Sequence, residues 1–249
     1  MQSYYVQINH QKLHYLENGE GECIVLLPSL SITSESYREL GDLLSKDFHV
    51  IIPDLYKGKS RFSKSVGHVK FYSQAFEEFI EKMNIKNYYL IGISGSGLLS
   101  SYIVKSIKNK PNKMLLFSTT FDPTILKYVG MRLLKGFPKL MANNMFSIRG
   151  IRTSILWLKD GFGYFLRHPI QFLREASVDF GQDADFSSSS PIDTTLFLAG
   201  KDEFFADINS AIESQRVTNL RVEKIDGSHC WFFLKPEKFI RKIVDSLCS

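Results

Sequence analysis

The feature that most constrains the fold of this chain is a series of short apolar runs in which polar residues seldom alternate with apolar ones. They occupy residues 23–27, 49–52, 88–93, 114–117 and 195–198, with a weaker, alternating run at 220–225. Runs of this length are too short for buried helices, and apolar side chains at successive positions are typical of strands covered on both faces. Each run is therefore predicted to be a buried strand.

The stretches between these runs have a different period. Apolar residues recur at three- and four-residue intervals in residues 36–44, 73–83, 97–107, 207–215 and 236–247, as in amphipathic helices. Residues 2–17 alternate in two short segments around Asn9 and His10, which predicts an antiparallel hairpin. The succession of strands and helices predicts the α/β class, with a mostly parallel, doubly wound sheet that binds ligands at the carboxyl ends of its strands.

One long segment interrupts this alternation. Residues 123 to about 185 are aromatic-rich and helical in pattern, and the polar tract 187–191 follows them. We expect a helical cap at 123–190, inserted between the two parts of the core at 1–122 and 191–249. Its apolar side chains are expected to pack against the top of the sheet, and some to line a hydrophobic pocket. These residues are Phe137, Met141, Met145, Phe146, Leu156, Trp157, Phe162, Phe165 and Phe172.

The cap also carries the basic excess of the chain. Residues 123–180 hold nine Lys or Arg and three Asp or Glu, whereas the whole chain has a formal net charge of +5. Such a segment is compatible with an anionic substrate, an acyl chain on a carrier protein, or peripheral contact with a membrane. Basic residues on amphipathic helices are nevertheless more often just the solvated face.

Composition excludes several classes of protein. With 44% hydrophobic and 23% charged residues, the chain is neither disordered nor collagen-like. Its three cysteines, Cys23, Cys230 and Cys248, lack zinc-binding spacing, so we expect no metal and a reducing compartment. No export signal or membrane-spanning stretch is recognisable, which favours a cytoplasmic protein. Nucleic-acid binding is not expected, because no groove-reading motif accompanies the mild basic charge.

The strongest chemical signal is the sequence YLIGISGSGLL at residues 89–99. A predicted strand runs directly into a helix through Ser94, as in a nucleophile elbow, where the positions two before and two after the nucleophile must be small. Gly92 and Ser96 meet this requirement. The amide of Gly95 would then face a developing oxyanion at the helix N-terminus. An ordinary turn of small residues, or a phosphate-binding turn, is the alternative.

A histidine and two acids follow other predicted strands. His229 lies in a loop after the run at 220–225, where it could act as a general base on Ser94. Asp202 and Glu203 follow the run at 195–198, and a buried carboxylate there would orient the imidazole. Asp122, after the preceding strand, is a weaker third candidate. The order serine, acid, histidine is that of α/β-hydrolases rather than of the other serine-triad folds.

Together these motifs resemble the α/β-hydrolase fold superfamily over nearly the whole chain, least in the cap. The matching segments are GISGSG at the elbow, PDL followed by GKS after the fourth strand of the family, and DGSH followed by PEKF at the histidine loop and last helix; they occupy residues 92–97, 53–60 and 226–239. The resemblance implies a serine esterase-like or lipase-like enzyme with an inserted cap.

The resemblance also bears on the oxyanion site and the acid. Residues 27–30, LPSL, stand where the family usually carries His-Gly, which implies Leu30 as the second oxyanion amide besides Gly95. An alignment without gaps from Gly200 places Glu203 at the catalytic acid, whereas a shift of one residue places Asp202 there.

The function predicted from sequence is a serine hydrolase without a cofactor. It would cleave an ester, thioester or related acyl bond of a small, hydrophobic substrate through an acyl-enzyme. Two alternatives use the same fold: a transacylase, lyase or C–C bond hydrolase, and a catalytically inactive member that only binds a ligand.

Overall fold

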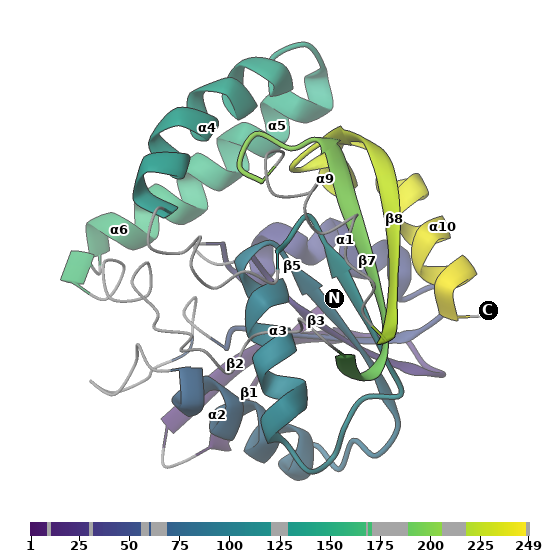
Figure 1. Ribbon diagram of the computed structural model, residues 1–249. Coiled ribbons are helices and arrows are strands. Elements are labelled where there is room, and N and C mark those ends of the chain that lie inside the picture. Colours follow the sequence, from purple (N-terminus) through teal and green to yellow (C-terminus); the bar gives the residue numbers. More distant parts are fainter. Residues whose placement is uncertain are drawn as a thin grey trace.

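The computed structural model describes residues 1–8, 11–29, 32–55, 60, 69–120, 129–167, 169–170, 189–205 and 218–247. Eight strands form one sheet in the order β1-β2-β4-β3-β5-β6-β7-β8 (Figure 1). Only the pairs β1 with β2 and β2 with β4 are antiparallel. The other five pairs are parallel. The predicted fold class, a mostly parallel α/β sheet, is confirmed.

The strands follow the predicted apolar runs closely. They are β1 (Gln2–Ile8), β2 (Gln11–Asn18), β3 (Cys23–Leu27), β4 (His49–Pro53), β5 (Tyr88–Ile93), β6 (Lys113–Phe117), β7 (Ser189–Lys201) and β8 (Thr218–Ser228). The helices are η1 (Ser34–Tyr37), α1 (Arg38–Leu44), α2 (Val69–Lys82), α3 (Gly95–Ser106), α4 (Val129–Asn144), α5 (Ile148–Trp157), the π-helical turn η3 (Leu158–Phe162), α6 (Gly163–Arg167), α9 (Trp231–Leu234) and α10 (Pro236–Leu247).

Alternate residues of each central strand enter two different hydrophobic cores. In β3, Val25 and Leu27 pack with the apolar side chains of α2 and α3. Ile24 and Leu26 point to the opposite face, where they join the apolar side chains of α1 and α10. Because successive side chains of a strand point to opposite faces, a strand with a core on each side must be apolar at every position. This explains why the strands read as unbroken apolar runs.

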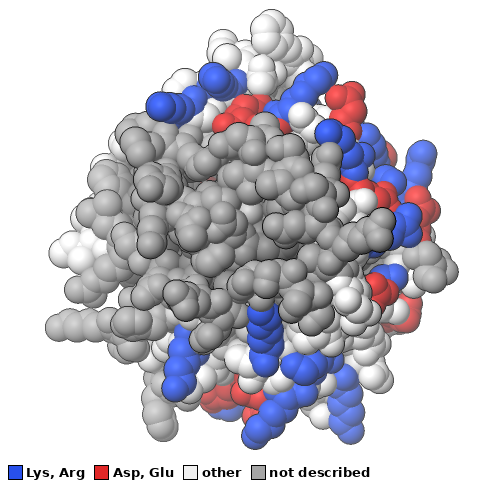
Figure 2. Space-filling view, in the orientation of Figure 1, with Lys and Arg blue, Asp and Glu red and all other residues white. Residues whose placement is uncertain are grey.

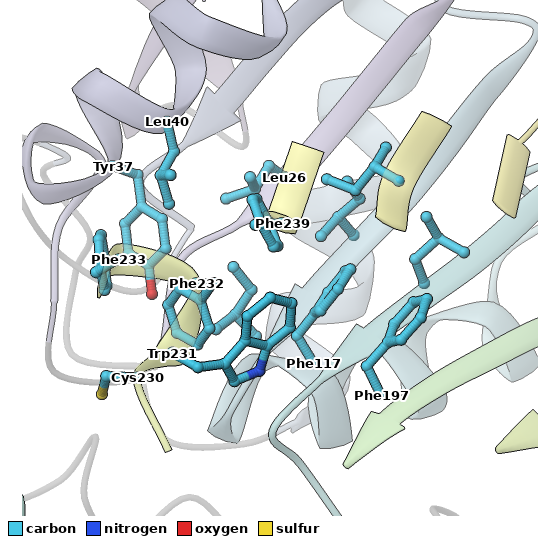
Figure 3. Packing of buried hydrophobic residues seen from close by; sticks show 14 of the residues in the cluster. Leu26, Tyr37, Leu40, Phe117, Phe197, Cys230, Trp231, Phe232, Phe233 and Phe239 are labelled. Atoms are coloured by element: carbon cyan, nitrogen blue, oxygen red, sulfur yellow. The ribbon is translucent and has the colours of Figure 1, made fainter. Parts of the chain in front are cut away.

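Aromatic rings fill the core between the sheet and α10. Phe117, at the end of β6, stacks on Phe197 of β7 with 4.6 Å between ring centroids, and it meets Phe239 of α10 edge-on at 4.7 Å. Trp231 lies against both Phe117 and Phe239 (Figure 3). All four side chains are almost completely buried. This cluster therefore fixes α9 and α10 against the carboxyl ends of the central strands.

Between β6 and β7, the described residues 129–167 form four helical segments, α4, α5, η3 and α6; we call them the inserted helices. They pack on one another, and α5 packs on α9 (Figure 1). Trp157 is buried as predicted, but Phe137, Met145, Phe146, Leu156 and Phe162 are exposed, so the expectation that these five residues pack against the sheet was wrong. The side chains of Phe165 and Phe172 lie outside the described part of the structure. The extent of a cap at 123–190 stays a prediction, because the structure describes only part of that range.

Two other predictions, the start of the strand before residue 195 and the helix at 207–215, are not matched by the described structure. Strand β7 begins at Ser189, within the tract that we expected to be a connection. Pro191 fits there because the pairing with β8 is irregular between Ser189 and Thr194, where a missing N–H costs little. The helix expected at 207–215 lies outside the described residues.

We predict that Phe117→Ala lowers the free energy of unfolding by about 3 to 5 kcal/mol, since a large, fully buried ring would leave a cavity between Phe197 and Phe239. Urea unfolding followed by fluorescence measures the change. Phe146→Ala is the matched control, because this ring is 89% exposed and its loss should change stability by less than about 0.5 kcal/mol. Equal effects of the two substitutions would contradict this account of the core.

Candidate active site

Ser94 occupies a strained turn between β5 and α3. Its backbone has φ 55° and ψ −125°, a region that non-glycine residues rarely adopt and that costs about 1 to 3 kcal/mol. The Ser94 N–H donates to the carbonyl of Phe117 at 2.9 Å. The Ser94 carbonyl accepts from the hydroxyl of Thr119 at 2.6 Å and from the N–H of Gly97 at 2.9 Å. These contacts hold the peptide units on either side of Ser94 in place.

The turn also requires two glycines. A Cβ on Gly92 would lie 2.4 Å from the hydroxyl oxygen of Ser100 and 2.8 Å from the Cα of Gly97. A Cβ on Gly97 would lie 2.6 Å from the Cγ2 of Thr119. Helix α3 can therefore start directly against the ends of β5 and β6 only because these positions lack side chains. From the sequence, Gly92 was predicted to need a small side chain, whereas Gly97 was identified only as part of the matching segment 92–97.

Ser96 stands where the usual elbow motif has glycine, and its side chain points inward. Its hydroxyl accepts from the N–H of Ile93 at 2.9 Å and donates to the carbonyl of Leu27 at 2.7 Å. The side chain thus links the elbow to the end of β3. This bond explains why serine is accommodated at the position.

His229 follows β8 and lies beside Ser94. Its Nε2 atom is 3.0 Å from the Ser94 hydroxyl oxygen, and its Nδ1 atom is 2.9 Å from Oδ2 of Asp202. Because an ionised carboxylate only accepts hydrogen bonds, Nδ1 carries the proton and donates to Asp202. Nε2 is then free to accept from the Ser94 hydroxyl. This is the tautomer that a general base for Ser94 requires.

Asp202 follows β7, and its position is fixed by the backbone that comes next. Its Oδ1 atom accepts from the N–H of Phe204 at 2.9 Å and from the N–H of Phe205 at 3.0 Å. The side chain is buried, with its second oxygen on His229. Three donors therefore compensate the charge of this carboxylate, as a buried acid requires.

Glu203, the other candidate acid, has a different partner. One of its oxygens accepts from the backbone N–H of His229 at 2.9 Å, and the other accepts from the side-chain amide of Asn143 in α4 at 2.7 Å. Of the two acids, Asp202 therefore contacts the imidazole and Glu203 contacts the backbone of the histidine loop. The contact with Asn143 had no signal in the sequence.

The remaining predicted site residues are only partly described. Gly95 is the first residue of α3, so its amide lies at the helix N-terminus, next to Ser94. Leu30 and Asp122 lie outside the described residues. Apolar rings border the imidazole: Phe204 meets it edge-on at 4.7 Å and Phe205 lies at 5.5 Å. The imidazole therefore forms hydrogen bonds with Ser94 and Asp202 and contacts aromatic rings with its remaining surface.

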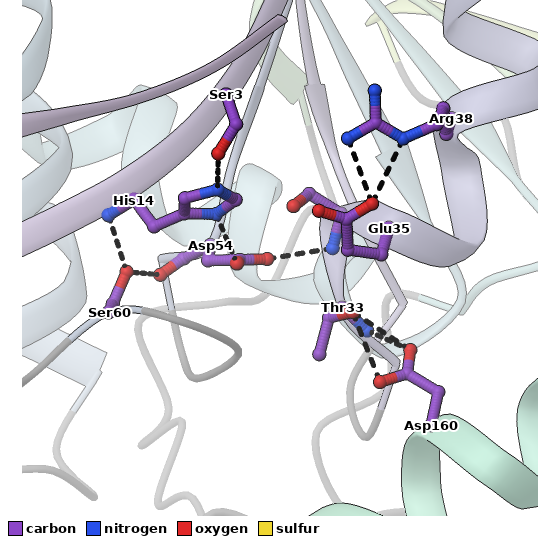
Figure 4. Close-up of polar contacts among 9 residues, drawn as sticks. Ser3, His14, Thr33, Glu35, Arg38, Asp54, Ser60 and Asp160 are labelled. Carbon is purple, nitrogen blue, oxygen red and sulfur yellow. Dashed lines mark hydrogen bonds and ion pairs between the residues drawn. The ribbon is translucent and has the colours of Figure 1, made fainter. Parts of the chain in front are cut away.

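A second set of serine, histidine and aspartate side chains occurs elsewhere in the protein. His14 in β2 lies 2.7 Å from Asp54 through Nδ1 and 2.7 Å from the hydroxyl of Ser3 through Nε2 (Figure 4). The other oxygen of Asp54 accepts from the N–H of Ser34. Ser3 lies in the edge strand β1, without the positive φ and the helix start that distinguish Ser94. This set joins β1, β2, β4 and η1, and we assign it a structural role.

The strand order, with the elbow between β5 and α3, is that of the α/β-hydrolase fold, and the chain has this fold. It is similar over nearly its whole length to several solved structures. They include an enol-lactonase from Burkholderia xenovorans (17% identity, 99% of this chain and 100% of that chain, TM-score 0.74), a bromoperoxidase from Bacillus anthracis (17%, 100% and 100%, 0.74) and a thermophilic esterase from Thermogutta terrifontis (15%, 99% and 98%, 0.73). No protein-family model matches the sequence, and neither does any curated protein.

Cys230, next to His229, is buried and does not take part in the line from Ser94 to Asp202. Burial raises the pKa of its thiol well above the ordinary value of 9.0, and the nearby charges of Asp202 and Glu203 raise it further. The thiol therefore stays protonated at neutral pH and is no nucleophile there. Cys230 instead packs in the hydrophobic core that contains Trp231 and Phe232.

This pKa shift predicts a loss of stability at alkaline pH. The unfolded chain releases the Cys230 proton near pH 9 while the folded chain retains it, so the free energy of unfolding falls above that pH by up to about 1.4 kcal/mol per pH unit. Urea unfolding at pH 8, 9 and 10 measures the slope. In Cys230→Ala the decline should be shallower. Identical slopes in the variant and the unmodified protein would show that Cys230 does not contribute.

Proposed function

We propose that this protein is a serine hydrolase that cleaves an ester, thioester or related acyl bond. The observation that carries this proposal is the continuous line from the Ser94 hydroxyl through His229 to Asp202, with distances of 3.0 and 2.9 Å. A nucleophile, a base and an orienting acid within hydrogen-bond reach of one another are the arrangement that activates a serine. The solved structures with this fold include an esterase and an enol-lactonase, which is consistent with acyl chemistry.

In this mechanism Ser94 attacks the carbonyl carbon of the substrate while His229 Nε2 accepts the hydroxyl proton. Asp202 stabilises the imidazolium that forms. The amide of Gly95, at the N-terminus of α3, stabilises the negative charge on the carbonyl oxygen, together with the amide of Leu30 that the family resemblance implies. His229 then donates its proton to the leaving group. The leaving group departs, and the acyl group remains bound to Ser94. A water molecule activated by His229 releases the acid.

The surroundings of the imidazole support an apolar acyl group. Phe204 and Phe205 lie beside His229, and no charged side chain other than Asp202 and Glu203 lies within hydrogen-bond distance of it among the described residues. An apolar lining with a few fixed polar groups is typical of pockets for small molecules. A panel of p-nitrophenyl esters of graded chain length would report the length of acyl group that the site accepts.

We predict that a fluorophosphonate probe forms one covalent adduct on Ser94, because this reagent requires a serine activated by a neighbouring base. Intact-protein mass spectrometry followed by peptide mapping locates the adduct. Ser94→Ala should remain unlabelled, whereas Ser3→Ala, which removes the serine of the second histidine and aspartate pair, should label as fully as the unmodified protein. An adduct on a folded Ser94→Ala protein, or none on the unmodified protein, would refute the assignment.

The two acids should differ in their effect on turnover. Asp202→Asn should lower kcat by about 10³- to 10⁴-fold, as removal of the orienting acid does in serine triads, since the amide no longer favours the required tautomer. Glu203→Gln keeps an oxygen for the N–H of His229 and should lower kcat by about fivefold. Steady-state kinetics on a water-soluble ester measures both. A larger loss in Glu203→Gln would reverse the assignment of the acid.

A further inference from the structure

The inserted helices expose a continuous apolar stripe. Helix α5, η3 and α6 follow one another without a break from Ile148 to Arg167. Large apolar residues recur along them at three- and four-residue intervals and are 42% to 89% exposed: Ile148, Ile151, Ile155, Leu158, Phe162 and Leu166. This spacing places them along one face of the helix. We call these six residues the outer stripe; Met145 and Phe146, in the preceding turn, are equally exposed.

The opposite face of the same helices is the one that packs on the protein. Its buried residues are Gly150, Thr153, Ser154 and Trp157, of which only Trp157 is large and apolar. Trp157 meets Phe233 of α9 edge-on at 5.3 Å. A surface helix of a globular protein normally turns its apolar side inward. Here the small and polar side is inward and most of the large apolar side chains are outward.

Asp160 fixes this orientation of the helix. Its carboxylate accepts from the backbone N–H and the hydroxyl of Thr33 at 2.7 to 3.1 Å (Figure 4). It also accepts from the hydroxyl of Ser36 at 2.7 Å. It is the only acidic residue among residues 129–167. Because this side chain is tied to the start of η1, the helix cannot rotate the outer stripe inward without breaking these bonds.

Basic residues predominate among the charged residues of the inserted helices. Residues 129–167 contain seven Lys or Arg, and Figure 2 shows basic side chains over the inserted helices, with acidic side chains close to some of them. Arg149 forms ion pairs with Glu39 and Glu237. Arg152, Lys159 and Arg167 are exposed and have no acidic partner within ion-pair distance among the described residues. Large apolar side chains flanked by unpaired basic ones are typical of helices that lie in the interface of an anionic membrane.

We propose that the outer stripe docks on the surface of an anionic lipid bilayer, with α5, η3 and α6 parallel to the membrane plane. In the described part of the chain, no helix is long and apolar enough to cross a membrane, so the contact would be peripheral. Pairing of two stripes from two copies of the chain is less favourable, because it would bring Arg152 and Lys159 of both copies together. The proposal goes beyond hydrolysis and does not depend on the role of Ser94.

Flotation with lipid vesicles tests the proposal. The unmodified protein should float with vesicles of phosphatidylcholine and phosphatidylglycerol, much less with phosphatidylcholine alone, and less at 0.5 M salt. Arg152→Gln/Lys159→Gln/Arg167→Gln should weaken partitioning by about 100-fold, since each basic residue near an anionic surface contributes about fivefold. Replacement of three exposed lysines away from these helices, Lys12→Gln/Lys70→Gln/Lys86→Gln, removes the same charge and should weaken it far less.

A second variant tests the apolar contribution. Ile148→Ser/Ile155→Ser/Leu166→Ser changes only exposed side chains and should lower partitioning by about tenfold for each residue that inserts. Its hydrolysis of a water-soluble ester should equal that of the unmodified protein. Ser94→Ala should float normally, which separates membrane docking from the proposed chemistry.

Three results would overturn the proposal. The first is no flotation with anionic vesicles, and the second is flotation that neither triple substitution in the inserted helices reduces. The third is a dimer in sedimentation velocity that Ile148→Ser/Ile155→Ser/Leu166→Ser dissociates, since this would assign the outer stripe to a second copy of the chain.

Discussion

The candidate site depends on one strained peptide, that of Ser94. A non-glycine residue at φ 55° is held only where the surrounding structure supplies enough contacts to offset the strain. Here the carbonyl of Phe117 and the hydroxyl of Thr119, both at the end of the neighbouring strand β6, bind the backbone on the two sides of Ser94. The parallel sheet itself therefore supplies the contacts that offset the strain, and the backbone conformation of Ser94 depends on β6.

The two buried histidine and aspartate pairs have similar distances but different surroundings. His14 with Asp54 and His229 with Asp202 have nearly the same geometry, at 2.7 and 2.9 Å. The first pair connects strands at the antiparallel edge of the sheet, whereas the second faces a strained serine at a helix start. Distances alone would give both pairs the same role. The backbone at the serine distinguishes them.

Much of the fold could be predicted from the sequence, because strands buried on both faces leave unbroken apolar runs. The motif around Ser94 could be recognised because its turn requires small residues at fixed positions. The loop with His229 could be recognised because it is a polar loop at the end of a strand. The choice between Asp202 and Glu203 could not be made. It depends on the pairing of β7 with β8, which is irregular between Ala199 and Lys201, just before the two acids. The outward orientation of the outer stripe could not be predicted either, because a helical period does not show which face of the helix packs on the protein. The contacts of Asp160 with Thr33 and Ser36 fix that face.

Glu203 has a mechanical consequence. Its carboxylate accepts from the amide of Asn143 in α4 and from the backbone N–H of His229, so it connects the inserted helices directly to the histidine loop. A shift of α4 must either break this tie or pull on the histidine loop. The position of a surface helix is thereby coupled to the imidazole that lies beside Ser94.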